Sequence, residues 1–133
     1  MDIPVIEIGK LLIALILGAI VGYEREINHK PAGLRTHILV ALGATLVTII
    51  SVDFFPNYPH IIAAVITGIG FIGAGTLIGN QGNVHGLTTA ASIWAVAIIG
   101  ITVGVGYFAL AFMSSLVVLL VLLFGKIEKK LEK

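Results

Sequence analysis

The chain has 133 residues, of which 58% are hydrophobic and only 11% are charged, and its formal net charge is +1. A water-soluble domain of this size needs a far more polar surface, so the composition excludes one and predicts an integral membrane protein. The absence of cysteine excludes a disulfide framework and a thiolate metal site, and the small net charge gives no sign of a nucleic-acid partner.

Long apolar runs separated by short polar segments predict an all-α membrane bundle with five transmembrane helices. The expected helices cover residues 3–26, 33–52, 61–78, 87–103 and 107–124. We expect a transmembrane domain over 1–125 and a basic cytoplasmic tail over 126–133, which holds four lysines and two glutamates. Glu7 and Lys10 lie in the first run, which lacks a small-residue cleavage pattern, so we expect a retained helix there and not a signal peptide.

Charge asymmetry predicts the orientation of the bundle. If the turn at 24–37 faces the cytoplasm, alternating helices place the polar turn at 80–86 and the lysine-rich tail on that side too. The loop after Asp53, interrupted by Pro56, has no lysine or arginine and falls on the other side. Every basic cluster except Lys10 then lies inside, as the positive-inside rule requires, so we predict an outside N-terminus and an inside C-terminus.

A weak internal repeat accompanies this pattern. At one constant offset and without gaps, Gly33 aligns with Gly86 and Thr36 aligns with Thr89. Both units run helix, turn, helix in the same direction, so the repeat would be parallel and not inverted. Glycine and alanine are so frequent in this chain that chance matches remain the alternative.

The segment 24–37 concentrates two acids, three bases and two histidines between long apolar runs, so it is the first candidate for function. Three interpretations stay open: an interfacial cluster that fixes topology, an ion site or charged vestibule, and a docking surface for another membrane protein. A bridge between Glu24 and Arg35 across the turn is sterically plausible and would neutralise both side chains.

Other polar side chains flank the two turns that we expect to meet at the inner face of the bundle. Hydroxyls at helix starts, including that of Ser92, either satisfy free amides or line an entrance that suits an anion better than a cation. The histidines at 29, 37 and 85 could share this side, although their spacing requires no metal. The candidate functional cluster comprises Glu24, Arg25, Glu26, Arg35, Thr36, His37, Asn83, Thr88 and Thr89.

Carboxylates together with water could hold magnesium or another ion, since magnesium prefers oxygen ligands and keeps several waters. Glu24 and Asp53 are therefore the candidate metal ligands. Glu24 and Glu26 point about 200° apart on a helix and cannot easily chelate one ion together. No other cofactor is indicated, and without a recognisable nucleophile–base pair or metal cage we do not expect an enzyme.

The glycines of the apolar runs predict close helix packing. Residues 68–73 match the letters of a dinucleotide fingerprint, but they lie inside an apolar run without the acidic residue that the fingerprint needs about 20 residues further on. Small residues at a spacing of four are typical of membrane helix contacts, with a broken helix that lines a cavity as the alternative. The predicted packing glycines are Gly18, Gly22, Gly68, Gly70, Gly73, Gly75 and Gly79, with Gly100 and Gly104 as a further pair.

Four sequence blocks occur in a characteristic order: Gly-Ala-Ile-Val-Gly at 18–22 with Glu-Arg-Glu at 24–26, Lys-Pro-Ala-Gly-Leu-Arg-Thr-His at 30–37, Gly-Ile-Gly-Phe-Ile-Gly-Ala-Gly at 68–75 and Val-His-Gly-Leu-Thr-Thr-Ala-Ala at 84–91. Together they resemble the MgtC/SapB family. The resemblance implies a five-span protein of the bacterial or archaeal inner membrane that takes part in magnesium homeostasis. Better-studied members carry a soluble C-terminal domain, which we do not expect in this chain, and His60, Ala64 and His85 depart from the usual pattern.

Two functions remain open at this point. The first is a regulator that contacts another membrane complex, which the resemblance suggests could include the F-type ATP synthase. The second is a transporter or channel for magnesium or another ion, with Glu24 and Asp53 as the cation-attracting groups. We favour the regulator, and we expect a homo-oligomer in either case because five spans form a small bundle.

Overall fold

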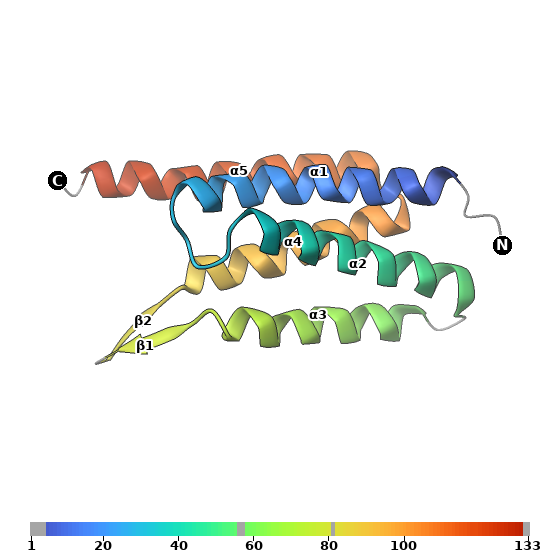
Figure 1. Ribbon diagram of the computed structural model, residues 1–133, viewed down its shortest axis with the longest axis horizontal. Helices are drawn as coiled ribbons and strands as arrows, with labels where there is room; N and C mark the ends of the chain where they lie inside the picture. The colour runs from blue at the N-terminus through green and yellow to red at the C-terminus, as the bar shows by residue number, and fades with distance from the viewer. Residues whose placement is uncertain (1–4, 56–57, 81, 132–133) are drawn as a thin grey trace.

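The structure is a computed structural model, and it describes residues 5–55, 58–80 and 82–131. Over these residues the chain forms five helices and one short antiparallel β-hairpin (Figure 1). The helices are α1 (Val5–Ile27), α2 (Leu34–Phe54), α3 (Tyr58–Ala74), α4 (Leu87–Val105) and α5 (Phe108–Leu131), and the strands are β1 (Ile78–Asn80) and β2 (Asn83–His85).

Four helices, α1, α2, α4 and α5, are long and apolar enough to cross a membrane, and α3 is a shorter apolar helix. The 17 residues of α3 rise about 26 Å, a little less than the roughly 30 Å hydrocarbon core of a bilayer. The predicted multi-pass bundle of five helices is therefore confirmed, with α3 as its short member.

The segment after α3 differs most from the predicted elements. The sequence predicts a helix to residue 78, but α3 ends at Ala74 and β1 begins at Ile78. Glycines on both sides of Ala74 weaken a helix there, and the Thr76 hydroxyl donates to the Gly73 carbonyl at 2.7 Å as the chain turns away. Gly82, with φ of +86°, then supplies left-handed backbone in the hairpin turn.

Other element boundaries also differ from the predicted ones. The last helix is predicted to end at residue 124, but α5 continues through the charged segment to Leu131. Gly106 ends α4 in a left-handed conformation, at the turn that leads into α5. The expected helix start at residue 3, the loop residues 56–57 and the final residues 132–133 lie outside the described residues.

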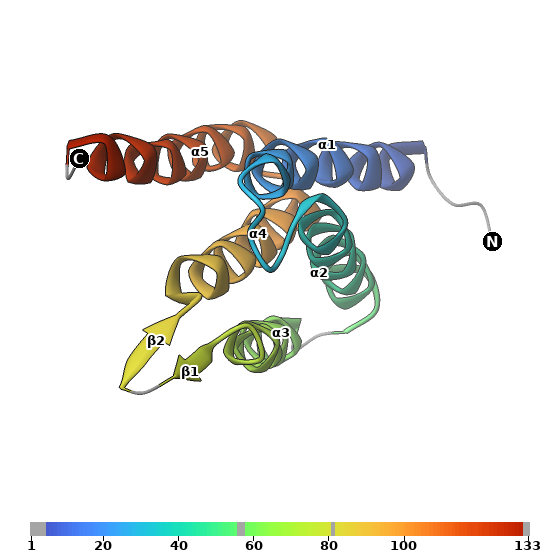
Figure 2. The ribbon, with the colours of Figure 1, turned by 60° about the vertical axis from the view of Figure 1, so that its left-hand side comes forward.

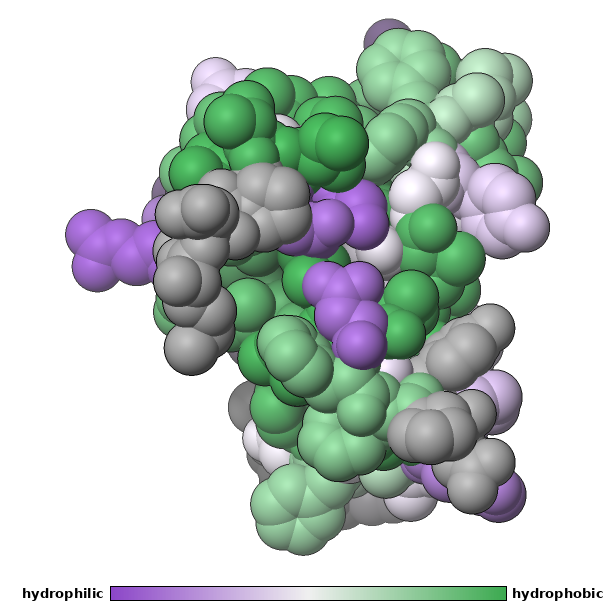
Figure 3. Space-filling view, turned by 90° about the vertical axis from the view of Figure 1, so that its right-hand side faces the viewer, coloured by the Kyte–Doolittle hydropathy of each residue, from purple (hydrophilic) through white to green (hydrophobic). Residues whose placement is uncertain are grey.

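Successive helices run in alternating directions, so their connections gather at two ends of the bundle (Figure 1). One end holds the α1–α2 turn, the β-hairpin and the C-terminal part of α5. We call this the polar end, and it comprises residues 24–37, 78–80, 82–86 and 126–131. The opposite end holds Asp53 at the end of α2, and its surface is largely apolar (Figure 3).

The core lies between α1, α2 and α4, which contact one another (Figure 2). α3 packs on α4 and α2, and α5 packs on α4 and α1. Many buried core side chains are alanine or valine, and such small side chains let membrane helices approach closely. Buried members of the core include Ala14, Val21, Ala41, Ala44, Val96 and Ala97.

Glycines make the closest of these helix contacts. A Cβ atom built on Gly18 of α1 would lie 2.9 Å from the His37 carbonyl oxygen of α2, and one on Gly100 of α4 would lie 2.5 Å from the Ala41 carbonyl oxygen. Gly22 and Gly104 are similarly close to α2. One glycine pair of α1 and one of α4 therefore let both helices pack closely on α2.

The remaining predicted packing glycines lie elsewhere. Gly68 and Gly70 of α3 have open space around them among the described residues, so they make no close helix contact within the chain. Gly73 is in ordinary contact with α4, Gly75 lies in the turn after α3, and Gly79 lies in β1.

The two halves of the weak repeat have the same helix order. α1 packs on α2 as α3 packs on α4, and both α2 and α4 begin at the leucines that follow the aligned Gly33 and Gly86. α2 and α4 run in the same direction through the centre (Figures 1 and 2). The Thr45 hydroxyl of α2 donates to the Gly100 carbonyl of α4 at 2.8 Å, which fixes their register.

Candidate functional site

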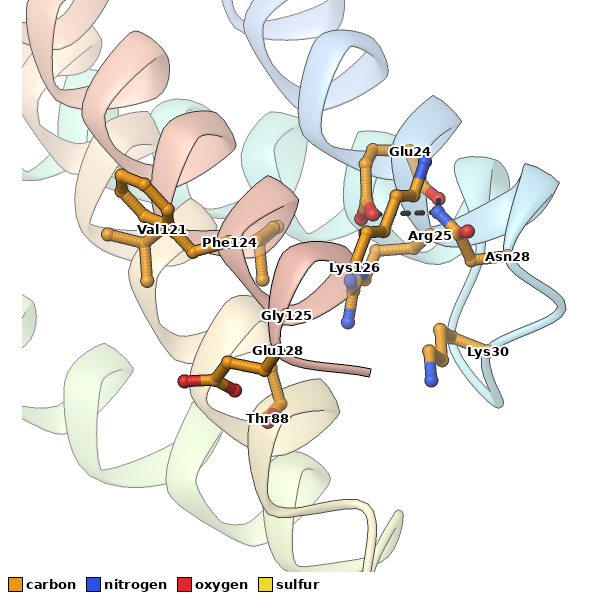
Figure 4. Close-up of a pocket in the computed structure, with 11 residues that line it drawn as sticks. Glu24, Arg25, Asn28, Lys30, Thr88, Val121, Phe124, Gly125, Lys126 and Glu128 are labelled. Atoms are coloured by element: carbon orange, nitrogen blue, oxygen red, sulfur yellow. Dashed lines mark hydrogen bonds and ion pairs between the residues drawn. The ribbon is translucent and has the colours of Figure 1, made fainter. Parts of the chain in front are cut away.

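A buried ion pair lies at the polar end, in the last turn of α1. Only 3% of Glu24 and 4% of Arg25 are exposed. The Arg25 Nε group donates to Glu24 Oε2 at 2.6 Å. One turn further on, the Asn28 amide donates to Glu24 Oε1 and to the Glu24 backbone carbonyl, each at 2.6 Å (Figure 4). Both carboxylate oxygens of Glu24 are therefore hydrogen-bonded, and its charge is neutralised by its sequence neighbour.

Arg35 does not form the predicted bridge with Glu24. Its side chain is exposed at the start of α2, and it forms no ion pair with any described residue. The acid that reaches across the turn is Glu26, whose Oε2 accepts a hydrogen bond from the Leu34 amide at 2.9 Å. A Cβ atom at Gly33 would collide with this carboxylate. Glu26 thus caps the first turn of α2, and glycine at position 33 leaves room for it.

His37, in the first turn of α2, contacts Ser92 in the second turn of α4. It is fully buried; its Nδ1 lies 2.8 Å from the Gly33 carbonyl oxygen and its Nε2 lies 2.9 Å from Ser92 Oγ. A carbonyl oxygen can only accept, so Nδ1 carries a proton in this contact. Ser92 Oγ also lies 2.8 Å from the Thr89 carbonyl oxygen. The sequence alone explains Ser92 by its own helix start, because the contact with His37 depends on the register of α2 against α4.

The other members of the predicted cluster have separate environments. Thr89 is buried beside Ser92, whereas Thr36 is half-buried. Asn83 is exposed on β2, and Thr88 is exposed at the start of α4. The structure therefore joins Glu24 to Arg25 and His37 to Thr89 through Ser92, but it does not bring all nine residues into one site.

Two cavities open at the polar end, and both include Arg25, Lys30 and Thr88 in their walls. The first has a volume of about 610 Å³ and lies between the end of α1, the start of α4 and the last turns of α5 (Figure 4). The second, of about 410 Å³, lies between the α1–α2 turn and the segment that runs from β2 into α4. The cationic side chains of the turn thus face open space on two sides.

The two candidate metal ligands lie far apart in the fold. Glu24 is buried at the polar end, whereas Asp53 is exposed near the last residue of α2 at the opposite end. No three His, Asp or Glu side chains of the described residues come together as a metal site. A magnesium ion on Glu24 would also lie beside the Arg25 guanidinium and compete with it, so the pair does not fit a resident cation.

Comparison with known proteins gives consistent matches. A family model described as the MgtC family matches residues 11–131. The chain is 40% identical over 122 residues to Protein SapB of Bacillus subtilis (strain 168), covering 84% of this chain and 53% of that protein. It is 41% identical over 128 residues to "Putative magnesium transporter YhiD" of Escherichia coli (strain K12), covering 86% and 60%.

A third relative is Protein MgtC of Salmonella typhimurium (strain 14028s / SGSC 2262), which is 44% identical over 110 residues, covering 82% of this chain and 48% of the relative. The chain therefore spans about half the length of the curated relatives it matches. No solved structure matches it.

Proposed function

The chain belongs to the MgtC family, and from this premise we propose that it serves magnesium homeostasis in the bacterial inner membrane by regulating another membrane complex through direct contact. The link to magnesium is supported by the name of the Escherichia coli relative, which describes a magnesium transporter. In this proposal the protein is not an enzyme, and it acts by binding its partner within the membrane, as a homo-oligomer.

The observation that favours a regulator over a transporter is that both carboxylate oxygens of the buried Glu24 are already hydrogen-bonded. A cation pathway needs oxygen ligands that exchange water for the ion, but both Glu24 oxygens are engaged by Arg25 and Asn28. Asp53 lies at the other end of the bundle. Between them, the helices meet through alanine, valine and glycine contacts that leave little room for a hydrated ion.

The outer helices supply surface for a partner. Most of α3 and α5 is exposed, including large apolar side chains such as Phe71 at 84% and Leu120 at 56%. In a bilayer these side chains contact either lipid or another transmembrane helix. The resemblance to the family makes the F-type ATP synthase the first partner to test.

Magnesium flux separates the two functions. Vesicles that contain the purified protein and an internal magnesium-sensitive dye should admit magnesium no faster than protein-free vesicles, because Glu24 is engaged by Arg25 and Asn28 and Asp53 lies at the opposite end of the bundle. Affinity purification from native membranes should at the same time retain a membrane complex.

Magnesium entry that Asp53→Asn abolishes would contradict the regulator and support the transporter. Asp53 is exposed, so this substitution removes a charge without leaving a buried partner unpaired. Vesicles without flux together with purification of the chain free of any membrane complex would also count against a contact regulator.

A further inference from the structure

We propose that the polar end binds one anionic phospholipid, with its phosphate in the cavity beside Arg25, Lys30 and Lys126 and its acyl chains in a groove between α1 and α5. This site is independent of the proposed regulatory function. It rests on a cationic cavity and an apolar groove that share residues at their junction.

The cavity supplies the cations for a phosphate. Arg25, Lys30 and Lys126 come from three different segments and line the same space of about 610 Å³ (Figure 4). Arg25 uses Nε to bind Glu24, and among the described residues no hydrogen bond engages its two terminal amino groups. A guanidinium that is held in place at one edge presents its other donors in a fixed geometry that suits phosphate oxygens.

Two acids also line the cavity, but they do not cancel its positive character. Glu24 is already paired with Arg25 and Asn28. Glu128 lies on the exposed part of α5. With three cationic and two acidic side chains in the wall, an excess of one positive charge remains, which favours an anionic headgroup over a zwitterionic one.

The groove supplies the apolar half of the site. It has a volume of about 690 Å³ and runs between α1 and α5, which lie side by side in Figure 1 and contact each other. From Leu15 to Tyr23 it extends about 12 Å along α1. The apolar side chains that line it include Leu15, Ile16, Ala19, Ile20, Leu119 and Leu123.

Lys126 lies where the two spaces join, because it lines both of them together with Glu24. On α5 it comes directly after the apolar run that ends at Phe124 and Gly125, so it lies where a membrane helix passes from hydrocarbon to headgroups. Ile16 in the groove wall is 56% exposed, which opens the groove to surrounding lipid. This arrangement fits an amphiphile better than a free phosphate ion.

Retention of lipid by the purified chain tests the site. The detergent-solubilised protein would be titrated with phosphatidylglycerol or with phosphatidylcholine of the same acyl chains, and bound lipid counted by native mass spectrometry. We expect one phosphatidylglycerol per chain and little phosphatidylcholine. Lys30→Gln and Lys126→Gln should each weaken binding about fivefold, as expected for removing one basic side chain near an anionic phosphate.

Lys130→Gln is the matched control for Lys126→Gln, since it removes a lysine one turn further along the same helix and outside both spaces. It should leave binding unchanged. Equal losses for the two lysines, or equal retention of the two lipids, would overturn the proposal. Unaltered thermal unfolding of the variants would show that the loss does not come from the fold.

Two further arms test the groove and the source of the phosphate. Ala19→Trp should fill the groove and reduce phosphatidylglycerol retention without a change in charge. If that variant does not fold, Leu15→Trp serves instead. Leu15 also lines the groove and is 40% exposed, so a larger side chain there can occupy the groove without entering the core. Inorganic phosphate at the lipid concentration should not displace the lipid, and full displacement would contradict binding by the acyl chains.

Discussion

Replacing Arg25 by alanine should lower the free energy of unfolding by about 3–5 kcal/mol, because it leaves a buried carboxylate without its countercharge. Glu24 is only 3% exposed, so its carboxylate is poorly hydrated in the folded protein. Asn28 would still donate one hydrogen bond, but a neutral amide does not balance the charge. Unfolding of the detergent-solubilised protein, followed by helix content, measures the loss.

A double replacement and a matched single replacement complete this test. Glu24→Gln combined with Arg25→Gln removes both charges and should destabilise far less than Arg25→Ala alone, since no unpaired ion stays buried. Arg35→Ala removes an exposed arginine from the same end and should change stability by less than about 0.5 kcal/mol. Equal effects of Arg25→Ala and Arg35→Ala would show that the buried pair does not stabilise the fold.

His37→Ala should destabilise the protein by about 2–5 kcal/mol, because it leaves a cavity, removes the hydrogen bond to Ser92 that connects α2 with α4, and leaves the Gly33 carbonyl without its side-chain partner. The imidazole is fully buried between the Gly33 carbonyl and the Ser92 hydroxyl, so no solvent replaces it. Ser92→Ala removes only one partner and should have a smaller effect.

A double-mutant cycle identifies the contact itself. If His37 and Ser92 interact directly, the double variant should be more stable than the sum of the single losses predicts, with a coupling free energy of about 0.5–3 kcal/mol. Thr36→Ala, next to His37 but only half-buried, serves as the control. Additive losses at positions 37 and 92 would contradict the connection between the two helix starts.

Much of the fold is predictable from the sequence, because a membrane imposes a simple length and hydropathy pattern on each span. The order of five helices and the grouping of polar segments at one end both follow from that pattern. The hairpin after α3 does not. Its strands have three residues each, which is too short for an alternating pattern to distinguish them from a polar turn.

The candidate site is less predictable than the fold, because a charged helix end offers several possible ion-pair partners. The sequence identifies Glu24 as important but not its partner, since Arg25, Lys30 and Arg35 are all within reach along the chain. Packing of α1 against α2 and α4 determines which base pairs with Glu24, because it buries Arg25 and leaves Arg35 exposed. In the same way, no local pattern links His37 with Ser92, which lie on different helices.

A closed ion pair also changes how mutations at Glu24 should be interpreted. Loss of activity in a Glu24 variant would ordinarily suggest a metal ligand or a transport step. Here the same loss follows from an unpaired Arg25 in a buried position, so stability must be measured beside function. Asp53, which is exposed and unconnected to the pair, is the cleaner probe of cation transport.

We predict that the charged turn, the hairpin and the end of α5 lie together on the cytoplasmic side of the membrane. Because the chain has no cysteine, single substitutions can be labelled with a membrane-impermeant maleimide. His85→Cys and Lys130→Cys should react only after the membrane is opened to the cytoplasmic side, whereas Asp53→Cys should react from outside in intact cells. Labelling of positions 85 and 130 from opposite sides of the membrane would contradict the account.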